Sequence, residues 1–314
     1  MDKSSLDPSL IEQLKKLEQK YEVMGQDLSS YLDGLLYSDY LTYWDYIHLD
    51  TLLSLQSPKT QFPDEQVFIL YHQITELYFR LILHEIDQIA SKASIEESFF
   101  ITRLDRVIRY FQHLENSFAI MIDGMEKEQF LKFRMALLPA SGFQSAQYRL
   151  IEICSTDIIN LVHGDRRRQL AEASLEEQME SLYWKSGATE LKSGKKTLTL
   201  QQFEKKYSGQ FLQTAKDHQD KNLRATYLRH FPNSDEVLKR LRAFDQLANV
   251  LWPLAHMRSA GRYLQKDPED IKATGGTNWQ KYLPPRFQKI TFFPEAWSEQ
   301  EKAEWGKAAI LRSQ

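Results

Sequence analysis

Apolar residues recur at intervals of three and four along most of the chain, which is the period of a helix that buries one face. The pattern is strongest in DEQVFILYHQITELYFRLILHEI, residues 64–86, which predicts a long helix reaching about residue 91. Asp64 ends the break SPKTQFPD and is a candidate N-cap for this helix. The same period predicts further helices at residues 8–24, 39–56, 94–125, 126–137, 143–161 and 235–264.

A more polar region, residues 164–225, interrupts this pattern and predicts a small helical insertion. It contains the clearest predicted loop, WKSGATELKSGKKTLT at residues 184–199, which is rich in Gly, Lys, Ser and Thr. No section alternates apolar and polar residues as strands do. We therefore predict an all-α protein with a single helical domain over residues 1–314.

Composition and charge narrow the function classes. The 314 residues are 42% apolar, and 40 Lys and Arg against 43 Asp and Glu give a net charge of −3. This charge balance provides no electrostatic field that attracts nucleic acid. No apolar segment approaches the roughly 18 residues that are needed to span a membrane. The single cysteine, Cys154, excludes an internal disulfide and any CxxC motif. Because the N-terminal residues lack a signal-peptide core, we expect a soluble cytoplasmic protein.

A histidine stands among the apolar residues of the long helix. Phe68, His72, Glu76 and Phe79 recur at four, four and three, so they share one helix face. Three interpretations are open. His72 is a core histidine bonded to a backbone carbonyl or to Glu76, a base or hydrogen-bonding group in an aromatic pocket, or a metal ligand paired with Glu76.

A second polar group in apolar surroundings is Arg134, one turn after Phe130. Its guanidinium requires an anion, either a ligand carboxylate held by two parallel hydrogen bonds or one of the chain's own acids. The turn that follows, Pro-Ala-Ser-Gly, adds donors from Ser141 and Gly142.

His256 is another imidazole on an apolar helix, in DQLANVLWPLAHMRSAGRYL. It is a candidate proximal ligand of haem iron or a buried structural histidine. Downstream, ATGGT presents Thr274 before a flexible Gly pair, which forms either a mobile lid or a plain turn. The chain has no Walker loop, no GxGxxG and no GxSxG.

Four segments, taken in order, resemble the tryptophan 2,3-dioxygenase family of all-helical haem enzymes. They are YWDYIHLDTLLSLQ, DEQVFILYHQITELYFRLILHE, FLKFRMALLPASGFQSAQYRLIE and ATGGT. The resemblance extends from about residue 28 to 298. Around His256 the family pattern W-R-x-x-H is replaced by WPLAH, so Pro253 stands where the family has Arg.

The resemblance implies a helical bundle around haem b, whose iron is ferrous in the active form. His256 would be the proximal iron ligand, with Ser141 and Gly142 near the haem. Tyr43 and Tyr46 match tyrosines that complete the pocket from a neighbouring subunit of a homotetramer.

The resemblance also assigns the substrate contacts. His72 would accept a hydrogen bond from the indole N–H, between walls formed by Phe68 and Phe130. Arg134 would pair with the carboxylate of L-tryptophan, and Thr274 would contact its amino acid end. A flat aromatic substrate with one N–H needs one such placed partner in an otherwise apolar pocket.

The implied reaction adds both atoms of O2 across the indole C2–C3 bond and gives N-formylkynurenine. Two alternatives remain open at this point. One is a divergent relative that oxygenates a substituted indole or another aromatic amino acid, with one oxygen atom inserted. The other is a haem- or tryptophan-binding sensor without turnover.

Overall fold

The computed structural model describes residues 7–38, 42–137, 142–189, 195–264 and 284–307. Within these ranges the regular structure is helical, and the only strand-like pairing is in two isolated bridges, Val162 with Leu182 and Thr189 with Lys196. The prediction of an all-α protein is confirmed. None of the helices that the structure describes has the length and apolar character of a membrane span.

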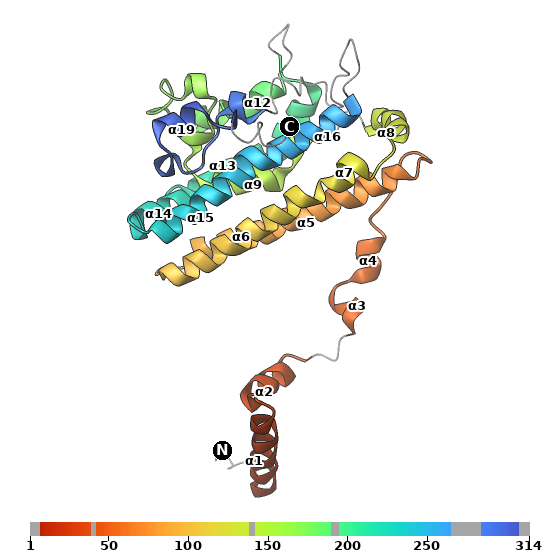
Figure 1. Cartoon of the computed structure of the whole chain (residues 1–314), viewed down its shortest axis with the longest axis vertical. Coiled ribbons are helices and arrows are strands. Elements are labelled where there is room, and N and C mark those ends of the chain that lie inside the picture. The colour runs from red at the N-terminus through yellow and green to blue at the C-terminus, as the bar shows by residue number, and fades with distance from the viewer. Residues whose placement is uncertain (1–6, 39–41, 138–141, 190–194, 265–283, 308–314) are drawn as a thin grey trace. The chain divides into compact units, whose positions relative to one another are not determined.

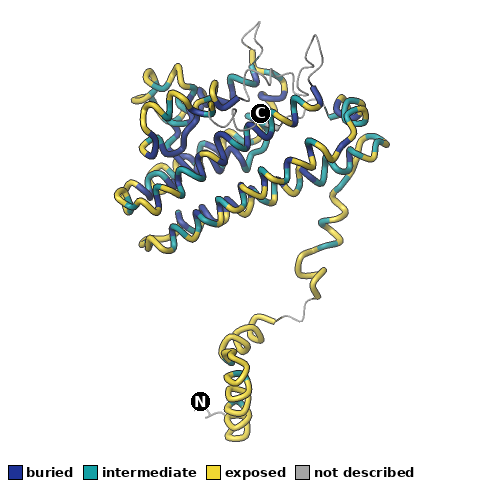
Figure 2. Tube along the Cα trace, in the orientation of Figure 1, coloured by how far each residue is buried: buried dark blue, intermediate teal, exposed yellow. Residues whose placement is uncertain are grey.

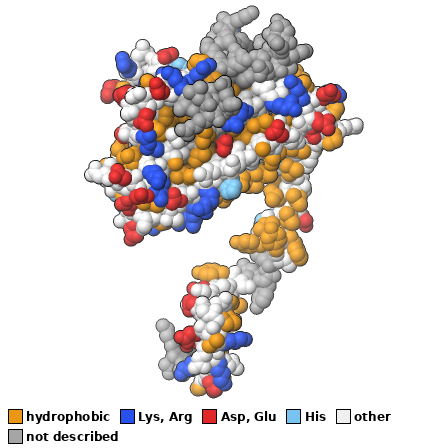
Figure 3. Space-filling view, in the orientation of Figure 1, with side chains coloured by type: hydrophobic (Ala, Val, Ile, Leu, Met, Phe, Trp, Pro, Cys, Tyr) orange, Lys and Arg blue, Asp and Glu red, His pale blue; other side chains and the backbone are white. Residues whose placement is uncertain are grey.

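Two compact units make up the chain, Met1–Ser57 and Pro58–Gln314. The prediction of one domain with an insertion at residues 164–225 stays a prediction. The first unit contains α1 (Pro8–Val23), α2 (Leu28–Leu36), α3 (Tyr43–Tyr46) and α4 (Leu49–Leu53). None of these four described helices has a buried residue, as Figure 2 shows, and hydrophobic side chains cover the surface of α3 and α4 (Figure 3).

The first unit follows its predicted helices only in part. Helix α1 confirms the prediction for residues 8–24, whereas α2 was not predicted. The single helix predicted at 39–56 is wrong, because α3 and α4 are separated at His48, whose φ of 51° is left-handed. A left-handed residue ends a right-handed helix whatever the apolar spacing on either side.

Two rows of helices form the second unit (Figure 1). The long helix α5 (Asp64–Ala90) runs beside α6 (Glu97–Ser117), and α6 packs against α15 (Asp235–Gln246). Helix α6 carries the centre of the core on one face, with its buried residues spaced at three and four: Phe100, Leu104, Val107, Phe111 and Leu114. Because the buried residues of α6 recur at helical spacing, the amphipathic pattern in the sequence was sufficient to predict a helix here.

Several predicted helix boundaries are wrong. Asp64 is the first helical residue rather than the N-cap, and its Oδ2 accepts a hydrogen bond from the Glu126 backbone N–H at 2.6 Å. The helix predicted at 94–125 breaks at Phe118 into α6 and α7 (Ala119–Asp123). The next predicted helix divides into α8 (Lys127–Phe133) and the 3₁₀ turn η1 (Arg134–Leu137).

The helix predicted at 143–161 also divides, at Thr156. Its backbone is extended there, and its hydroxyl donates to the Phe292 carbonyl at 2.5 Å. The resulting elements are η2 (Gly142–Gln144), α9 (Ala146–Ser155) and α10 (Ile158–Leu161).

The described part of the region 164–225 is largely helical. Its elements are η3 (Gly164–Arg166), α11 (Leu175–Glu180), α12 (Tyr183–Gly187), α13 (Leu198–His218) and the start of α14 (Leu223–His230). The loop predicted at 184–199 is therefore wrong at both of its ends, and residues 190–194 lie outside the described residues.

A single helical run confirms the prediction for residues 235–264. It consists of α15, a π-helical turn η4 (Leu247–Leu251) and α16 (Trp252–Leu264). The described C-terminal elements are α18 (Pro285–Gln288), η5 (Pro294–Ala296) and α19 (Glu299–Ala303).

The fully buried carboxylate of Asp245 ties this C-terminal segment to α15. Its oxygens accept four hydrogen bonds: from the backbone N–H of Phe292 (2.8 Å), that of Phe293 (3.3 Å), Trp297 Nε1 (2.8 Å) and Asn249 Nδ2 (2.7 Å). Burial raises the pKa of Asp245 to about 6, and the four donors act in the opposite direction.

Replacing Asp245 by alanine should lower the free energy of unfolding by about 3–5 kcal/mol, because it leaves four buried donors without an acceptor. Asp245→Asn keeps one acceptor oxygen, so its free energy of unfolding should fall by less than that of Asp245→Ala. Urea unfolding of both variants measures the effect, with Asp220→Ala at an exposed carboxylate as the control. A loss below about 1 kcal/mol for Asp245→Ala would contradict this anchoring role.

Candidate active site

The imidazole of His72 has one nitrogen committed to the backbone of its own helix. Nδ1 lies 2.7 Å from the Phe68 carbonyl oxygen, and the two rings lie 4.1 Å apart between centroids. A carbonyl only accepts, so Nδ1 carries the hydrogen, and Nε2 of the neutral ring is left as an acceptor. The bond to a backbone carbonyl agrees with the structural interpretation of His72, whereas the exposure of the residue contradicts a place in the core.

The protonation state of His72 follows from its surroundings. Desolvation by the protein around the ring lowers the pKa of His72, while the Phe68 hydrogen bond and the charge of Glu76 raise it less. The ring is therefore neutral at pH 7.

An aromatic wall joins three helices beside His72. The ring centroid of Phe68 on α5 lies 6.2 Å from that of Phe130 and 5.7 Å from that of Phe133, both on α8. Phe130 in turn lies 4.6 Å from Tyr263 on α16. The structure thus brings the two predicted wall residues, Phe68 and Phe130, into one aromatic cluster.

His256 on α16 faces the same region. Its ring lies 5.4 Å from Phe118 and 6.3 Å from Trp252. Burial lowers the pKa of His256 to about 4, and a charge on His72 lowers it further, which places the two imidazoles within electrostatic range of each other. Across the described ranges, no hydrogen bond is found to either ring nitrogen of His256.

These residues fit a haem group. A metal ligand must be the neutral imidazole, which is the form that the depressed pKa of His256 maintains. The aromatic rings of Phe118 and Trp252 supply an apolar border for a flat macrocycle. A bare metal ion bound by His72 and Glu76 finds no support, because no group of three or more His, Cys, Asp or Glu side chains gathers in the part of the chain that the structure describes.

Arg134 opens the turn η1, directly after the wall residues of α8. Its side chain is buried, and this burial lowers the pKa of Arg134 from its ordinary value. Phe130 precedes it by one turn, so the guanidinium and the aromatic wall come from the same short segment.

The other predicted site residues are placed only in part. Gly142 begins η2, while Ser141 and Thr274 lie outside the described residues. Tyr43 and Tyr46 belong to α3 of the first unit, where both side chains are exposed. The roles of these residues stay predictions.

Sequence reasoning missed three aromatic residues of the candidate site. Trp252 stands one turn before His256 and Tyr263 two turns after it, so helical spacing was a usable signal for both. Phe118 lies at the break between α6 and α7, where it contacts Tyr71, Trp252 and His256, and no local pattern marks it.

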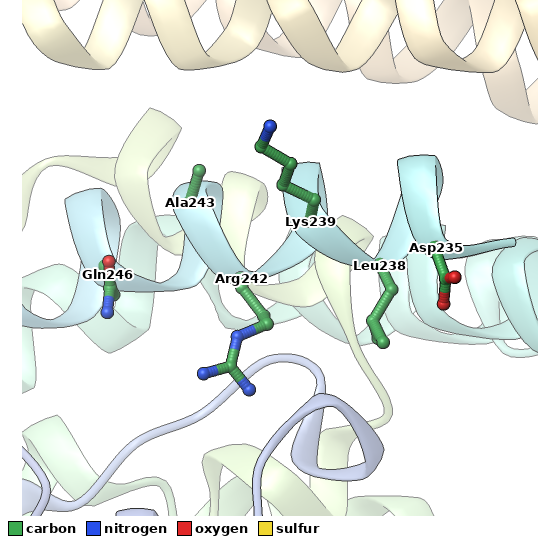
Figure 4. A pocket seen from close by; sticks show the side chains of 6 residues that line it. All are labelled: Asp235, Leu238, Lys239, Arg242, Ala243 and Gln246. Atoms are coloured by element: carbon green, nitrogen blue, oxygen red, sulfur yellow. The ribbon is translucent and has the colours of Figure 1, made fainter.

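An open depression of about 420 Å³ lies elsewhere, along α15, and contains none of these residues. Figure 4 shows Lys239 and Arg242 pointing in opposite directions from this helix. Arg242 donates to the Ala296 carbonyl and to Glu301 of the C-terminal segment, which makes its role structural.

Comparison with known proteins supports the resemblance. The sequence model of the tryptophan 2,3-dioxygenase family matches residues 34–241. Similar curated proteins are tryptophan 2,3-dioxygenases of Ruegeria sp. (strain TM1040), 40% identical over 119 residues, and of Ruegeria pomeroyi, 35% identical over 152 residues. These matches cover 37% and 47% of this chain and span only 42% and 54% of the relatives' own length.

A longer match is to the tryptophan 2,3-dioxygenase of Polaromonas sp. (strain JS666), 27% identical over 266 residues, 82% of this chain and 86% of that protein. The family match includes Phe68, His72, Phe130 and Arg134, whereas His256 lies beyond its end. Since it extends over more than half of the chain, this protein belongs to the tryptophan 2,3-dioxygenase family.

Proposed function

We propose that this protein cleaves the indole 2,3 bond of L-tryptophan with O2 and releases N-formylkynurenine, with haem b as its cofactor. The observation that carries the proposal is the tautomer of His72. Its Nδ1–H is bound to the Phe68 carbonyl, so Nε2 offers one lone pair beside an aromatic wall. An indole has one N–H donor on an otherwise apolar ring, which is the complement of that arrangement.

The substrate is held at both ends in this proposal. Phe68 and Phe130 border the indole, and its N–H donates to His72 Nε2. The buried guanidinium of Arg134 binds the carboxylate with two parallel donors, and Thr274 contacts the amino acid end. Fixing both ends orients the C2–C3 bond and removes the entropy of alignment from the barrier.

His256 would hold the iron through its neutral imidazole, and Ser141 and Gly142 would lie near the macrocycle. Ferrous haem supplies the binding and activation of O2 when it is present. The contribution of the chain is to keep the site apolar, through Phe118 and Trp252 on the His256 side, and to hold the indole in one orientation.

Assembly as a homotetramer belongs to the same proposal, with Tyr43 and Tyr46 completing the site of a neighbouring subunit. The described helices of the first unit leave large apolar side chains exposed: Tyr31, Leu35, Leu36, Tyr43, Trp44, Tyr46 and Leu53. Large apolar side chains exposed in this number are typical of protein interfaces.

Mass spectrometry of the product tests the proposed reaction. Reduced, haem-loaded protein is mixed with L-tryptophan under ¹⁸O2, and the product should carry two labelled oxygen atoms. One labelled atom would replace the proposal by the divergent oxygenase. No product, with a haem spectrum that still responds to L-tryptophan, would replace it by the sensor.

The affinity for L-tryptophan should depend on pH through His72. The pKa of His72 is lowered in the folded chain, so the neutral ring persists through pH 6.5, and it is lost as the pH falls through the folded pKa. Protonation turns Nε2 into a donor that opposes the indole N–H. Spectral titration from pH 8 downward should therefore show constant affinity at first and weaker binding once the pH falls through the folded pKa of His72. His72→Gln, which does not titrate, should flatten this acidic branch, and an acidic branch that survives the substitution would contradict the assignment.

A further inference from the structure

A proline lies inside the helical run that carries His256. Pro253 is the second residue of α16, where a proline has no N–H to donate and its ring clashes with the carbonyl four residues earlier. The run accommodates it through the π-helical turn Leu247–Leu251, in which the Trp252 N–H bonds to the Leu247 carbonyl five residues earlier.

This turn leaves the next carbonyl without a backbone donor. At the same spacing of five, the Ala248 carbonyl requires the N–H of residue 253, which proline lacks. The hydroxyl of Tyr148, on α9, donates to this carbonyl oxygen at 2.9 Å, and both residues are buried. A side chain from another helix thus replaces the hydrogen bond that Pro253 removes.

The π turn decides which way His256 faces. One extra residue in a turn rotates everything after it by about 100°, because an α-helix has 3.6 residues per turn. His256 follows Pro253 by three residues, so its orientation depends on the turn being kept. The Tyr148 ring supports the same arrangement, since it packs 5.4 Å from Phe79, which lies 5.9 Å from Trp252.

We propose that Tyr148 is a positioning residue: its hydroxyl holds the π turn that Pro253 imposes and thereby fixes the rotation of His256 toward the haem. The inference rests on the proposed function for the role of His256 as iron ligand. The pairing of Tyr148 with Pro253 itself does not depend on haem.

A double-mutant cycle on the full chain without haem tests the pairing. Tyr148→Phe should raise the unfolding equilibrium constant roughly 5- to 100-fold, because the Ala248 carbonyl becomes a buried acceptor without a partner. In the Pro253→Ala background residue 253 regains its N–H, and the same substitution should cost little. If Tyr148→Phe destabilised the wild-type chain and the Pro253→Ala chain equally, the proposed coupling of Tyr148 to Pro253 would be overturned. Tyr227→Phe, which removes a long 3.4 Å hydrogen bond to Pro232, is the matched control and should show no coupling to residue 253.

The iron–histidine stretching band of the reduced, haem-loaded protein tests the positioning role, since loss of stability alone does not move it. Tyr148→Phe should shift or broaden this band, and Tyr148→Phe combined with Pro253→Ala should sharpen it again. An unchanged band in Tyr148→Phe would overturn the inference and leave the proposed function intact. If the wild-type protein shows no such band, His256 is not the iron ligand, and the positioning role of Tyr148 falls with that assignment. The double-mutant cycle decides separately whether Tyr148 and Pro253 are coupled.

Discussion

Replacing His256 by alanine is expected to abolish stable haem binding by the purified chain. The side chain offers a neutral imidazole nitrogen with no hydrogen-bond partner among the described residues, next to Phe118 and Trp252. Without it, the proposed bond between the chain and the haem iron is lost. Haem content and the Soret absorbance after gel filtration measure the loss.

Two further variants separate loss of the ligand from loss of the fold. His113→Ala removes an exposed imidazole of α6 that stacks on Tyr78, and it should bind haem normally. His256→Gly should regain haem absorbance when imidazole is added, because the free ring occupies the vacated position. A wild-type spectrum for His256→Ala would remove the proximal assignment.

Arg134→Ala should weaken the binding of L-tryptophan by about 2–5 kcal/mol, which is roughly 30- to 4,000-fold in Kd. The guanidinium is buried at the end of the aromatic wall, and removing it would leave the substrate carboxylate desolvated without a positive partner. Arg134→Lys keeps the charge but loses the two-pronged geometry, so it should fall between wild type and Arg134→Ala. Titration of the haem spectrum with L-tryptophan gives the affinities.

Tryptamine, which lacks the carboxylate, provides the internal control for this prediction. The wild-type protein should prefer L-tryptophan strongly over tryptamine, and Arg134→Ala should bind the two almost equally. Arg80→Ala, at an exposed position of α5, should keep the preference. If Arg134→Ala still discriminated between the ligands as the wild type does, the carboxylate would bind elsewhere.

Helical periodicity was sufficient to predict the fold class and the largest elements. The 27-residue helix α5 and the run from Asp235 to Leu264 both carry an apolar face long enough to be read without structural information. The internal breaks were not predictable. Thr156 ends α9 through a bond to Phe292, a residue far along the chain, and no local pattern reports such a partner.

The candidate site was also predictable only in part. Phe68 and His72 are one turn apart, so their contact follows from spacing alone. The effect of a charge on His72 on the pKa of His256 depends instead on how α5 and α16 are arranged in the second unit, which spacing does not encode. Pro253 was visible as a departure from the family pattern, whereas its compensation by Tyr148 required the structure.

The described helices of the first unit bury no residue of their own, although α1 alone has 16 residues. Helices of this length are marginal in water, and most helical stability in proteins comes from packing an apolar face. In the proposed homotetramer this unit would gain its packing from neighbouring subunits, so its order would follow mass action: it would grow with protein concentration and fall on dilution. If Tyr43 and Tyr46 complete the site of a neighbouring subunit, the specific activity would therefore rise with enzyme concentration.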